Sequence, residues 1–250
     1  TARIRFRRRC RTRLFMGRHN ATYFTTSNKH LKKFNLLTNL FMLQFITHSN
    51  EKYDYLTSAI EALKGGCHWI QLRMKNIPEQ TVIATALQLK EYCRKYNAKL
   101  ILDDHVQATL KTGADGVHLG KNDMSPSDAR KILGNGYIIG GTANTLDDIE
   151  RLIKEGVDYI GLGPFRYTET KKNLSPILGI DGYKKILMAC KEKGYTIPIV
   201  AIGGITKNDI PEIMSTGVTG IALSGSILRA ENPQVETQLI INLINKYNNE

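Results

Sequence analysis

From residue 42 onward, short apolar runs alternate with segments of helical periodicity, and this alternation constrains the fold more than any other feature. The apolar runs are continuous, which is typical of parallel strands covered on both faces. They predict strands at 43–47, 68–73, 99–103, 116–119, 137–140, 159–161, 198–202 and 220–223. The helical patterns lie at 55–63, 79–96, 106–112, 126–133, 146–155, 181–193, 207–215 and 233–246. This order predicts an α/β protein, a single (β/α)8 TIM barrel over residues 42–250.

Four similar phrases support a closed ring over the runner-up, a doubly wound sheet. Each phrase places a glycine just after a predicted helix, where glycine is the usual C-terminal cap, and leads directly into a predicted strand. The phrases begin Lys64-Gly-Gly-Cys, Thr112-Gly-Ala-Asp, Glu155-Gly-Val-Asp and Thr216-Gly-Val-Thr. The chain also lacks a Gly-x-Gly-x-x-Gly turn after its first predicted strand, the usual sign of a dinucleotide-binding sheet.

The positive charge is concentrated in a tail. The formal net charge is +12, but residues 1–41 hold eleven Lys and Arg and no acidic residue, which leaves 24 basic and 23 acidic residues in 42–250. An Arg-rich segment without acids fits a disordered arm, a transit peptide or sequence upstream of the true start. We favour the last, because Thr1 is not an initiator and Met42 stands directly before the first predicted strand.

The rest of the composition predicts a cytoplasmic protein that binds small molecules. No apolar run approaches the roughly 20 residues that span a bilayer, so a membrane is not expected as a partner. The tail has no interleaved aromatic residues to stack on bases, which disfavours nucleic acid. The four cysteines have no paired or metal-ligand spacing, and Cys67 and Cys93 are expected in the core. The sequence is compatible with a homo-oligomer as well as with a monomer.

Polar residues follow the predicted strands at their carboxyl ends, which carry the chemistry in barrel enzymes. His118 is expected to point into the barrel or to pack against a loop, and not to act as a base. The candidate residues, in strand order from the second to the eighth, are Gln71, Arg73 and Lys75; Asp103 and Asp104; Asp123; Thr142; Thr168, Thr170 and Lys171; Gly204; and Ser224 and Gly225.

Two kinds of anion site are expected at this mouth. The stretch 161–172 follows a strand with glycines, two threonine hydroxyls and two lysines, which together form a cradle for an anion. Glycine-rich and small-residue loops after strands seven and eight are the usual phosphate site of barrels. Carboxylates beside basic groups suit a Mg²⁺ that bridges pyrophosphate oxygens. Two phosphate sites at one mouth predict an enzyme that joins two substrates.

Several motifs, in this order, resemble those of the thiamine phosphate synthase family. They are Gln71-Leu-Arg-Met-Lys75, Asp103-Asp104, Gly116-Val-His-Leu-Gly-Lys-Asn-Asp123, Gly161-Leu-Gly-Pro, Thr168-Glu-Thr-Lys171 and Ala201-Ile-Gly-Gly-Ile205. The resemblance covers residues 42–245. It implies a transferase of thiamine biosynthesis that joins hydroxymethylpyrimidine diphosphate to hydroxyethylthiazole phosphate and releases pyrophosphate. It also implies a dissociative displacement in which a pyrimidine methylene cation is captured by the thiazole nitrogen.

The resemblance assigns a role to each candidate residue. It implies that Asp104 and Asp123 bind Mg²⁺, and that Arg73, Lys75 and Lys171 neutralise the leaving pyrophosphate. Gln71 joins them in contacting the pyrimidine diphosphate. The thiazole phosphate site matches Thr168, Thr170, Gly204, Ser224 and Gly225.

The sequence departs from the family pattern in four places, one of them a pair of residues. Asp103 stands where Asn is usual, Thr142 replaces Ser, Asn144 replaces a common His, and Ser224-Gly225 replaces an apolar-Ser pair. The extra carboxylate of Asp103 is expected either to tighten the metal or to repel diphosphate. The rivals are the related thiazole tautomerase, a nucleic-acid or membrane-surface binder that uses the tail, and a catalytically silent ligand-binding barrel.

Overall fold

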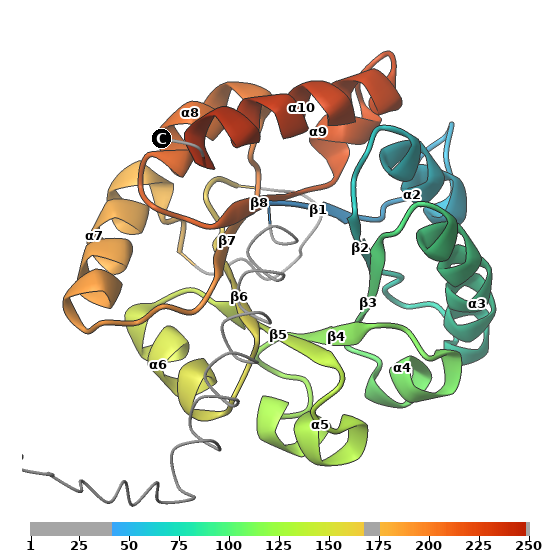
Figure 1. Cartoon of the computed structure of the whole chain (residues 1–250), viewed down its shortest axis with the longest axis horizontal. Coiled ribbons are helices and arrows are strands. Elements are labelled where there is room, and N and C mark those ends of the chain that lie inside the picture. The colour runs from blue at the N-terminus through green and yellow to red at the C-terminus, as the bar shows by residue number, and fades with distance from the viewer. Residues whose placement is uncertain (1–41, 168–175, 249–250) are drawn as a thin grey trace, which may run out of the picture. The chain divides into compact units, whose positions relative to one another are not determined.

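The eight predicted strands form one closed parallel barrel (Figure 1). The computed structural model describes residues 42–167 and 176–248. Each strand pairs with the next, and β1 pairs with β8, where Phe45 lies opposite Leu223. The strands are β1 Leu43–Ile46, β2 Trp69–Leu72, β3 Lys99–Asp103, β4 Gly116–Leu119, β5 Ile138–Ala143, β6 Tyr159–Leu162, β7 Ile199–Ile202 and β8 Gly220–Leu223. The predicted fold of this part of the chain is confirmed. The predicted tail, 1–41, lies outside the described residues.

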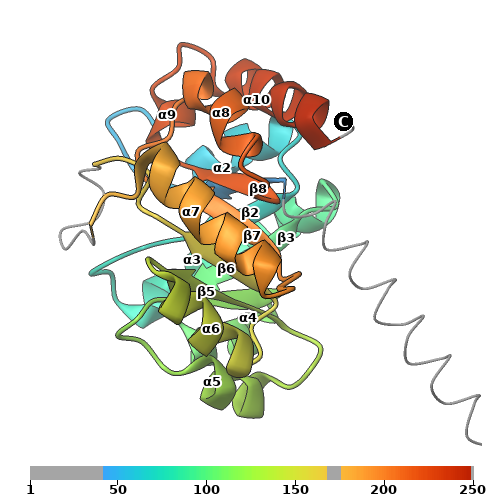
Figure 2. The same cartoon turned by 90° about the vertical axis from the view of Figure 1, so that its left-hand side faces the viewer.

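Helices cover the outside of the ring, and Figure 2 shows α6 and α7 lying across its outer face. The long helices match their predicted segments to within a few residues. Their bounds are α2 Tyr55–Lys64, α3 Glu79–Lys95, α4 Val106–Thr112, α5 Pro126–Leu133, α6 Leu146–Lys154, α7 Gly179–Glu192 and α10 Pro233–Asn248.

Two predicted segments differ from the structure. The helix predicted at 207–215 is a 3-10 turn, η1 Lys207–Asp209, followed by the short α8 Ile210–Met214. Pro211 explains the division, because it has no N–H to donate to the preceding turn and is suited to the first turn of a new helix. The small-residue loop predicted after strand eight is only Ser224 long, since Gly225 begins a further short helix, α9 Gly225–Leu228.

The repeated glycines end their helices as predicted. Gly66, Gly113, Gly156 and Gly217 all have a positive φ. At Gly113 the backbone is left-handed, with φ of 60°, and its N–H donates to the carbonyl of Leu110 over 3.3 Å. A side chain is strained in this conformation, so glycine lets each unit turn from helix to strand.

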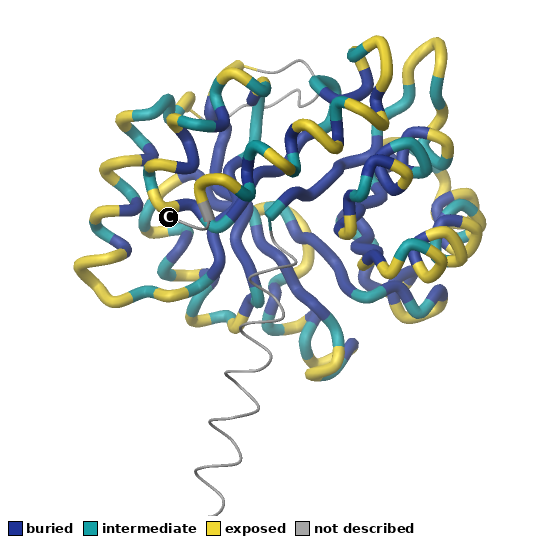
Figure 3. Tube along the Cα trace, turned by 45° about the horizontal axis from the view of Figure 1, so that its top comes forward, coloured by how far each residue is buried: buried dark blue, intermediate teal, exposed yellow. Residues whose placement is uncertain are grey.

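The core lies between the strands and the helices, and Figure 3 shows buried strands inside partly exposed helices. Cys67, Cys93 and Cys190 are all buried. Burial raises the pKa of Cys67 to about 11 and that of Cys93 to about 12, so these thiols stay protonated at neutral pH. This agrees with the predicted role of Cys67 and Cys93 in the core. None of the described helices is both long and apolar enough to cross a membrane.

Candidate active site

A carboxylate and two cations meet at the carboxyl ends of β2 and β3. Asp103, with 8 % of its side chain exposed, accepts a hydrogen bond at Oδ1 from Nε2 of Gln71 over 2.7 Å. Its Oδ2 is buried, accepts no hydrogen bond from the described residues, and lies 3.4 Å from Nε of Arg73 and 3.2 Å from Nζ of Lys75. The negative charge on this buried oxygen is therefore balanced by the two cations. The carboxylate of Asp103 in turn orients Arg73 and Lys75, which are predicted to bind phosphate.

Asp104 takes an unusual backbone conformation beside this cluster. Its φ is 65°, in the left-handed region, and its N–H donates to the carbonyl of His118 over 2.9 Å. Its carboxylate contacts the ammonium of Lys75 directly. Aspartate tolerates this conformation better than most residues, and such strain is typical of functional positions.

Asp123 lies in the loop after β4. Its Oδ2 accepts a hydrogen bond from the N–H of Gly120 over 2.7 Å, which closes this loop. A small cavity beside the loop is lined by Asp123 and also by Thr142 from the end of β5. The structure thus brings together two candidates that are 19 residues apart in sequence.

The carboxylates of Asp103 and Asp104 are oxygen donors, the type of ligand that Mg²⁺ takes. Among the described residues, no group of three or more His, Cys, Asp and Glu side chains lies together. Mg²⁺ takes only one or two protein carboxylates, with water and substrate phosphates as its other ligands. The ammonium of Lys75 lies against Asp104 and Asp103, which shows that this place accepts a positive charge.

A chain of hydrogen bonds inside the barrel ends at Thr142. Tyr159 Oη accepts from Nε2 of Gln44 over 3.2 Å, on a strand that is not adjacent, and lies 2.9 Å from Nδ1 of His118. His118 Nε2 lies 3.0 Å from Oγ1 of Thr142. Burial raises the pKa of Tyr159, so the phenol keeps its proton.

This chain orients the hydroxyl of Thr142. Because Gln44 donates to Tyr159, the phenol O–H is available to donate to Nδ1 of His118. In the tautomer with Nδ1 as the acceptor, Nε2 of His118 carries a proton and donates to Oγ1 of Thr142, whose own O–H remains available to donate. His118 is therefore buried and points into the barrel, as predicted, and it holds a candidate substrate-binding hydroxyl.

Replacing Tyr159 by Phe should lower the free energy of unfolding by about 1–3 kcal/mol, because Gln44 and His118 each lose a buried partner. Denaturant unfolding of both proteins measures the change. Tyr167→Phe is the matched control, since Tyr167 is 63 % exposed. Equal stability of the Tyr159 variant and the wild type would show that this hydroxyl does not hold the network.

The loop after β7 has a positive φ at both of its glycines. Gly203 and Gly204 have φ values of 99° and 68°. A Cβ on Gly204 would lie 2.7 Å from the carbonyl oxygen of Tyr167, so only glycine fits there. Thr168, Thr170 and Lys171 follow Tyr167 and lie outside the described residues, as does the end of the predicted anion cradle, 168–172.

Arg166 braces the same loop, and the sequence analysis missed it. Its Nη1 donates to the carbonyl of Gly204 over 3.0 Å, and its two terminal nitrogens bind Asp209 over 2.9 and 2.8 Å. The hydrogen bond from Arg166 holds the pKa of Asp209 at about 2. The only signal for this role in the sequence is that Arg166 follows the end of a predicted strand.

Replacing Asp209 by Asn should lower the free energy of unfolding by about 1 kcal/mol at pH 7, since Arg166 is half exposed. Asp209 has a pKa below its ordinary 3.8, so its contribution is present above about pH 4 and is lost as the pH falls toward 2. Unfolding measured from pH 7 to pH 3 should show the gap to wild type closing. A gap of constant size would contradict this assignment.

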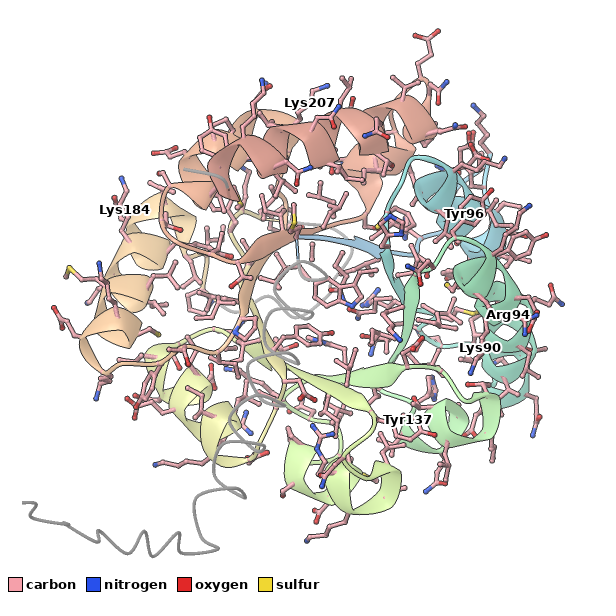
Figure 4. The ribbon with its side chains drawn as sticks, in the orientation of Figure 1. Lys90, Arg94, Tyr96, Tyr137, Lys184 and Lys207 are labelled. Atoms are coloured by element: carbon pink, nitrogen blue, oxygen red, sulfur yellow. The ribbon has the colours of Figure 1, made fainter. Side chains whose placement is uncertain are left out.

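Three of the four departures have a visible structural role, and that of Thr142 in the hydrogen-bond chain is given above. Asn144 is buried, and its amide donates to the carbonyl of Gly163, which ties the β5 loop to the β6 loop. Asp103 pairs with the two cations described above. At Gly225 the guanidinium of Arg229, which sequence reasoning missed, lies close by. In Figure 4, by contrast, Lys90, Arg94 and Lys184 lie on the outer helices, away from the mouth.

Comparison with known proteins decides the family. The sequence model of the family described as thiamine monophosphate synthase matches residues 43–227, from β1 to α9. The chain belongs to the thiamine monophosphate synthase family. A family member, the thiamine-phosphate synthase of Bacteroides thetaiotaomicron, is 58 % identical over 201 residues, which cover 80 % of this chain and 96 % of that protein. The thiamine-phosphate synthase of Flavobacterium johnsoniae is 46 % identical over 196 residues, 78 % of this chain and 92 % of that protein.

Solved structures agree with the thiamine monophosphate synthase family. A thiamine phosphate pyrophosphorylase from Pyrococcus furiosus superposes with a TM-score of 0.75 at 33 % identity, covering 84 % of this chain and 98 % of that one. A 3-hexulose-6-phosphate synthase gives a TM-score of 0.60 at 14 % identity over 81 % of this chain and 99 % of its own, which shows the fold alone. The family resemblance stated from the motifs is therefore confirmed.

Proposed function

We propose that this chain is a thiamine phosphate synthase, which joins hydroxymethylpyrimidine diphosphate to hydroxyethylthiazole phosphate and releases pyrophosphate. Membership of the thiamine monophosphate synthase family and relatives of up to 58 % identity support this activity. The observation that carries it is the cluster of Arg73 and Lys75 on Asp103 and Asp104, at the carboxyl ends of adjacent strands. A barrel enzyme that bound only one phosphate group, at β7 and β8, would not require this cluster at β2 and β3.

The reaction needs no protein nucleophile. Arg73 and Lys75 stabilise the negative charge that develops on the departing pyrophosphate, and Lys171 is proposed to join them. The bond from the pyrimidine methylene carbon to the diphosphate oxygen breaks with its electron pair on oxygen, and the thiazole nitrogen donates its lone pair to the resulting cation. The mouth holds the two substrates in line, which supplies much of the rate.

Mg²⁺ is proposed as the cofactor. Asp104 and Asp123 would hold it, and when bound it would neutralise pyrophosphate oxygens. Gln71, Asp103 and Thr142 are proposed to contact or orient the pyrimidine diphosphate. Binding of the thiazole phosphate is proposed for Thr168, Thr170, Gly204, Ser224 and Gly225. The cytoplasm is the proposed compartment, and no nucleic-acid or membrane partner is proposed.

The test is product formation by the purified chain given both phosphorylated substrates, with and without Mg²⁺. Thiamine phosphate and pyrophosphate should appear in equal amounts, and only when both substrates are present. A second reaction with thiazole carboxylate phosphate alone tests the rival tautomerase. Isomerisation of that compound without any thiamine phosphate formation would replace the synthase proposal. Deleting residues 1–41 should spare the synthase, whereas it would abolish a binder that uses the tail.

A further inference from the structure

Arg229 directly follows α9, and its guanidinium lies back over the first residue of that helix. A Cβ built on Gly225 would lie 2.4 Å from Nη1 of Arg229 and 3.1 Å from its Cζ. The space that a side chain at 225 would need is therefore filled by the guanidinium. Gly225 is two residues past the end of β8, so this positive charge lies at the edge of the barrel that carries the proposed site.

The surroundings of His48 place Arg229 near the other cations of the mouth. His48 follows β1, which pairs with β8 on one side and β2 on the other. Burial lowers the pKa of His48, and the positive charges of Arg73 and Arg229 lower it further. Both guanidinium groups therefore lie within electrostatic reach of one imidazole. The N–H of Arg73 also donates to Oγ1 of Thr47 over 2.9 Å, which holds the β1 and β2 ends together.

Arg229 has no acidic partner in the part of the chain that the structure describes. Within 42–167 and 176–248 its guanidinium has neither an ion pair nor a hydrogen bond, and the residue is exposed. The other arginines that border the strand ends differ, since Arg73 pairs with Asp103 and Arg166 pairs with Asp209. A guanidinium at the mouth without an acidic partner is suited to bind an anionic substrate, because its charge and its donors are available.

The position of Arg229 indicates which of the two substrate anions, the thiazole phosphate or the pyrimidine diphosphate, it contacts. In the β7 and β8 pair, Ile202 lies opposite Ala222, so the loop containing Gly204 and the start of α9 are neighbours. The cluster proposed to bind the diphosphate lies at β2 and β3, with β1 between it and β8. We propose that Arg229 binds the phosphate group of the thiazole substrate and makes the enzyme select the phosphorylated form over the free alcohol. This inference rests on the proposed synthase activity and adds a residue to its second phosphate site.

Kinetics with two nucleophiles test this role. In Arg229→Gln, kcat/KM for hydroxyethylthiazole phosphate should fall about 10-fold to 100-fold, the range of one or two lost charged hydrogen bonds. The value for unphosphorylated hydroxyethylthiazole should stay unchanged, as should the KM for the diphosphate. Arg229→Lys should recover part of the loss, because it keeps the charge but not the planar fork.

Lys184→Gln is the matched control, because it removes one charge from the outer helix α7. It should behave as wild type with both nucleophiles. An equal loss with alcohol and phosphate, or a loss confined to the diphosphate, would overturn the assignment of Arg229. Absence of product with the wild-type protein would instead contradict the synthase proposal. Calorimetric binding of the thiazole phosphate to wild type and Arg229→Gln then tests the site by itself, and equal affinities would overturn it.

Discussion

Replacing Asp104 by Asn is expected to lower kcat/KM for thiamine phosphate formation by about 100-fold or more. The variant removes one of the two carboxylates proposed to hold Mg²⁺ and leaves Lys75 with Asp103 as its nearest acid. Asparagine suits the measurement because it tolerates the positive φ of residue 104, so the backbone should be retained. Activity should recover in part at higher Mg²⁺ concentration if the lost group is a metal ligand.

A direct metal measurement separates this role from a structural one. Mn²⁺ added in place of Mg²⁺ and followed by electron paramagnetic resonance should bind more weakly to Asp104→Asn than to wild type. Asp128→Asn is the matched control, because Asp128 is exposed on α5 and its carboxylate has the local partners Lys131 and Ser125. If Asp104→Asn bound Mn²⁺ as wild type does and kept its turnover, Asp104 would be removed from the metal site.

The second large effect is expected at Lys75. Lys75→Gln should lower kcat about 100-fold, because its ammonium is placed to stabilise charge on the leaving pyrophosphate. The loss should appear in kcat more than in KM, since that charge grows as the bond to the diphosphate breaks. Steady-state kinetics with the diphosphate as the varied substrate measures both constants.

The ion pairs of Lys75 make a second outcome measurable. Without its ammonium, the buried Asp103 Oδ2 keeps only Arg73 at 3.4 Å, so the variant should also unfold more easily. Lys75→Gln combined with Asp103→Asn should regain stability without regaining kcat. Lys131→Gln, on the exposed face of α5, controls for loss of one surface charge. A change in kcat of less than about 3-fold would show that Lys75 does not stabilise the charge on the leaving pyrophosphate.

The barrel could be read from the sequence because its signals are local. Continuous apolar runs predicted β3, β4 and β8 with their observed bounds, and glycines such as Gly113 ended the helices as expected. The errors lie where a local pattern was short or divided. A helix of four residues at Gly225 has no period to detect, and Pro211 divided a segment that otherwise read as one helix.

The candidate site could be predicted only in part. Strand-end positions brought Gln71, Arg73, Lys75, Asp103 and Asp104 together as expected, because every parallel strand ends at the same edge. The pairing within this set was not predictable. Whether a cation meets Asp103 or Asp104 depends on side-chain directions that no sequence pattern encodes.

The sequence by itself determined the ring of eight strands, the family and the types of residue at the mouth, since each depends on neighbours along the chain or on motif order. The tertiary structure alone decided three contacts: Tyr159 with His118, Arg166 with Asp209, and Arg229 over Gly225. The first two join residues 41 and 43 positions apart. The third depends on a guanidinium folding back into space that glycine leaves open. The first two contacts follow from closure of the barrel, which sets which distant side chains meet, and no local periodicity carries that information. The third joins residues four apart on one short helix, and only the conformation of the Arg229 side chain decides it.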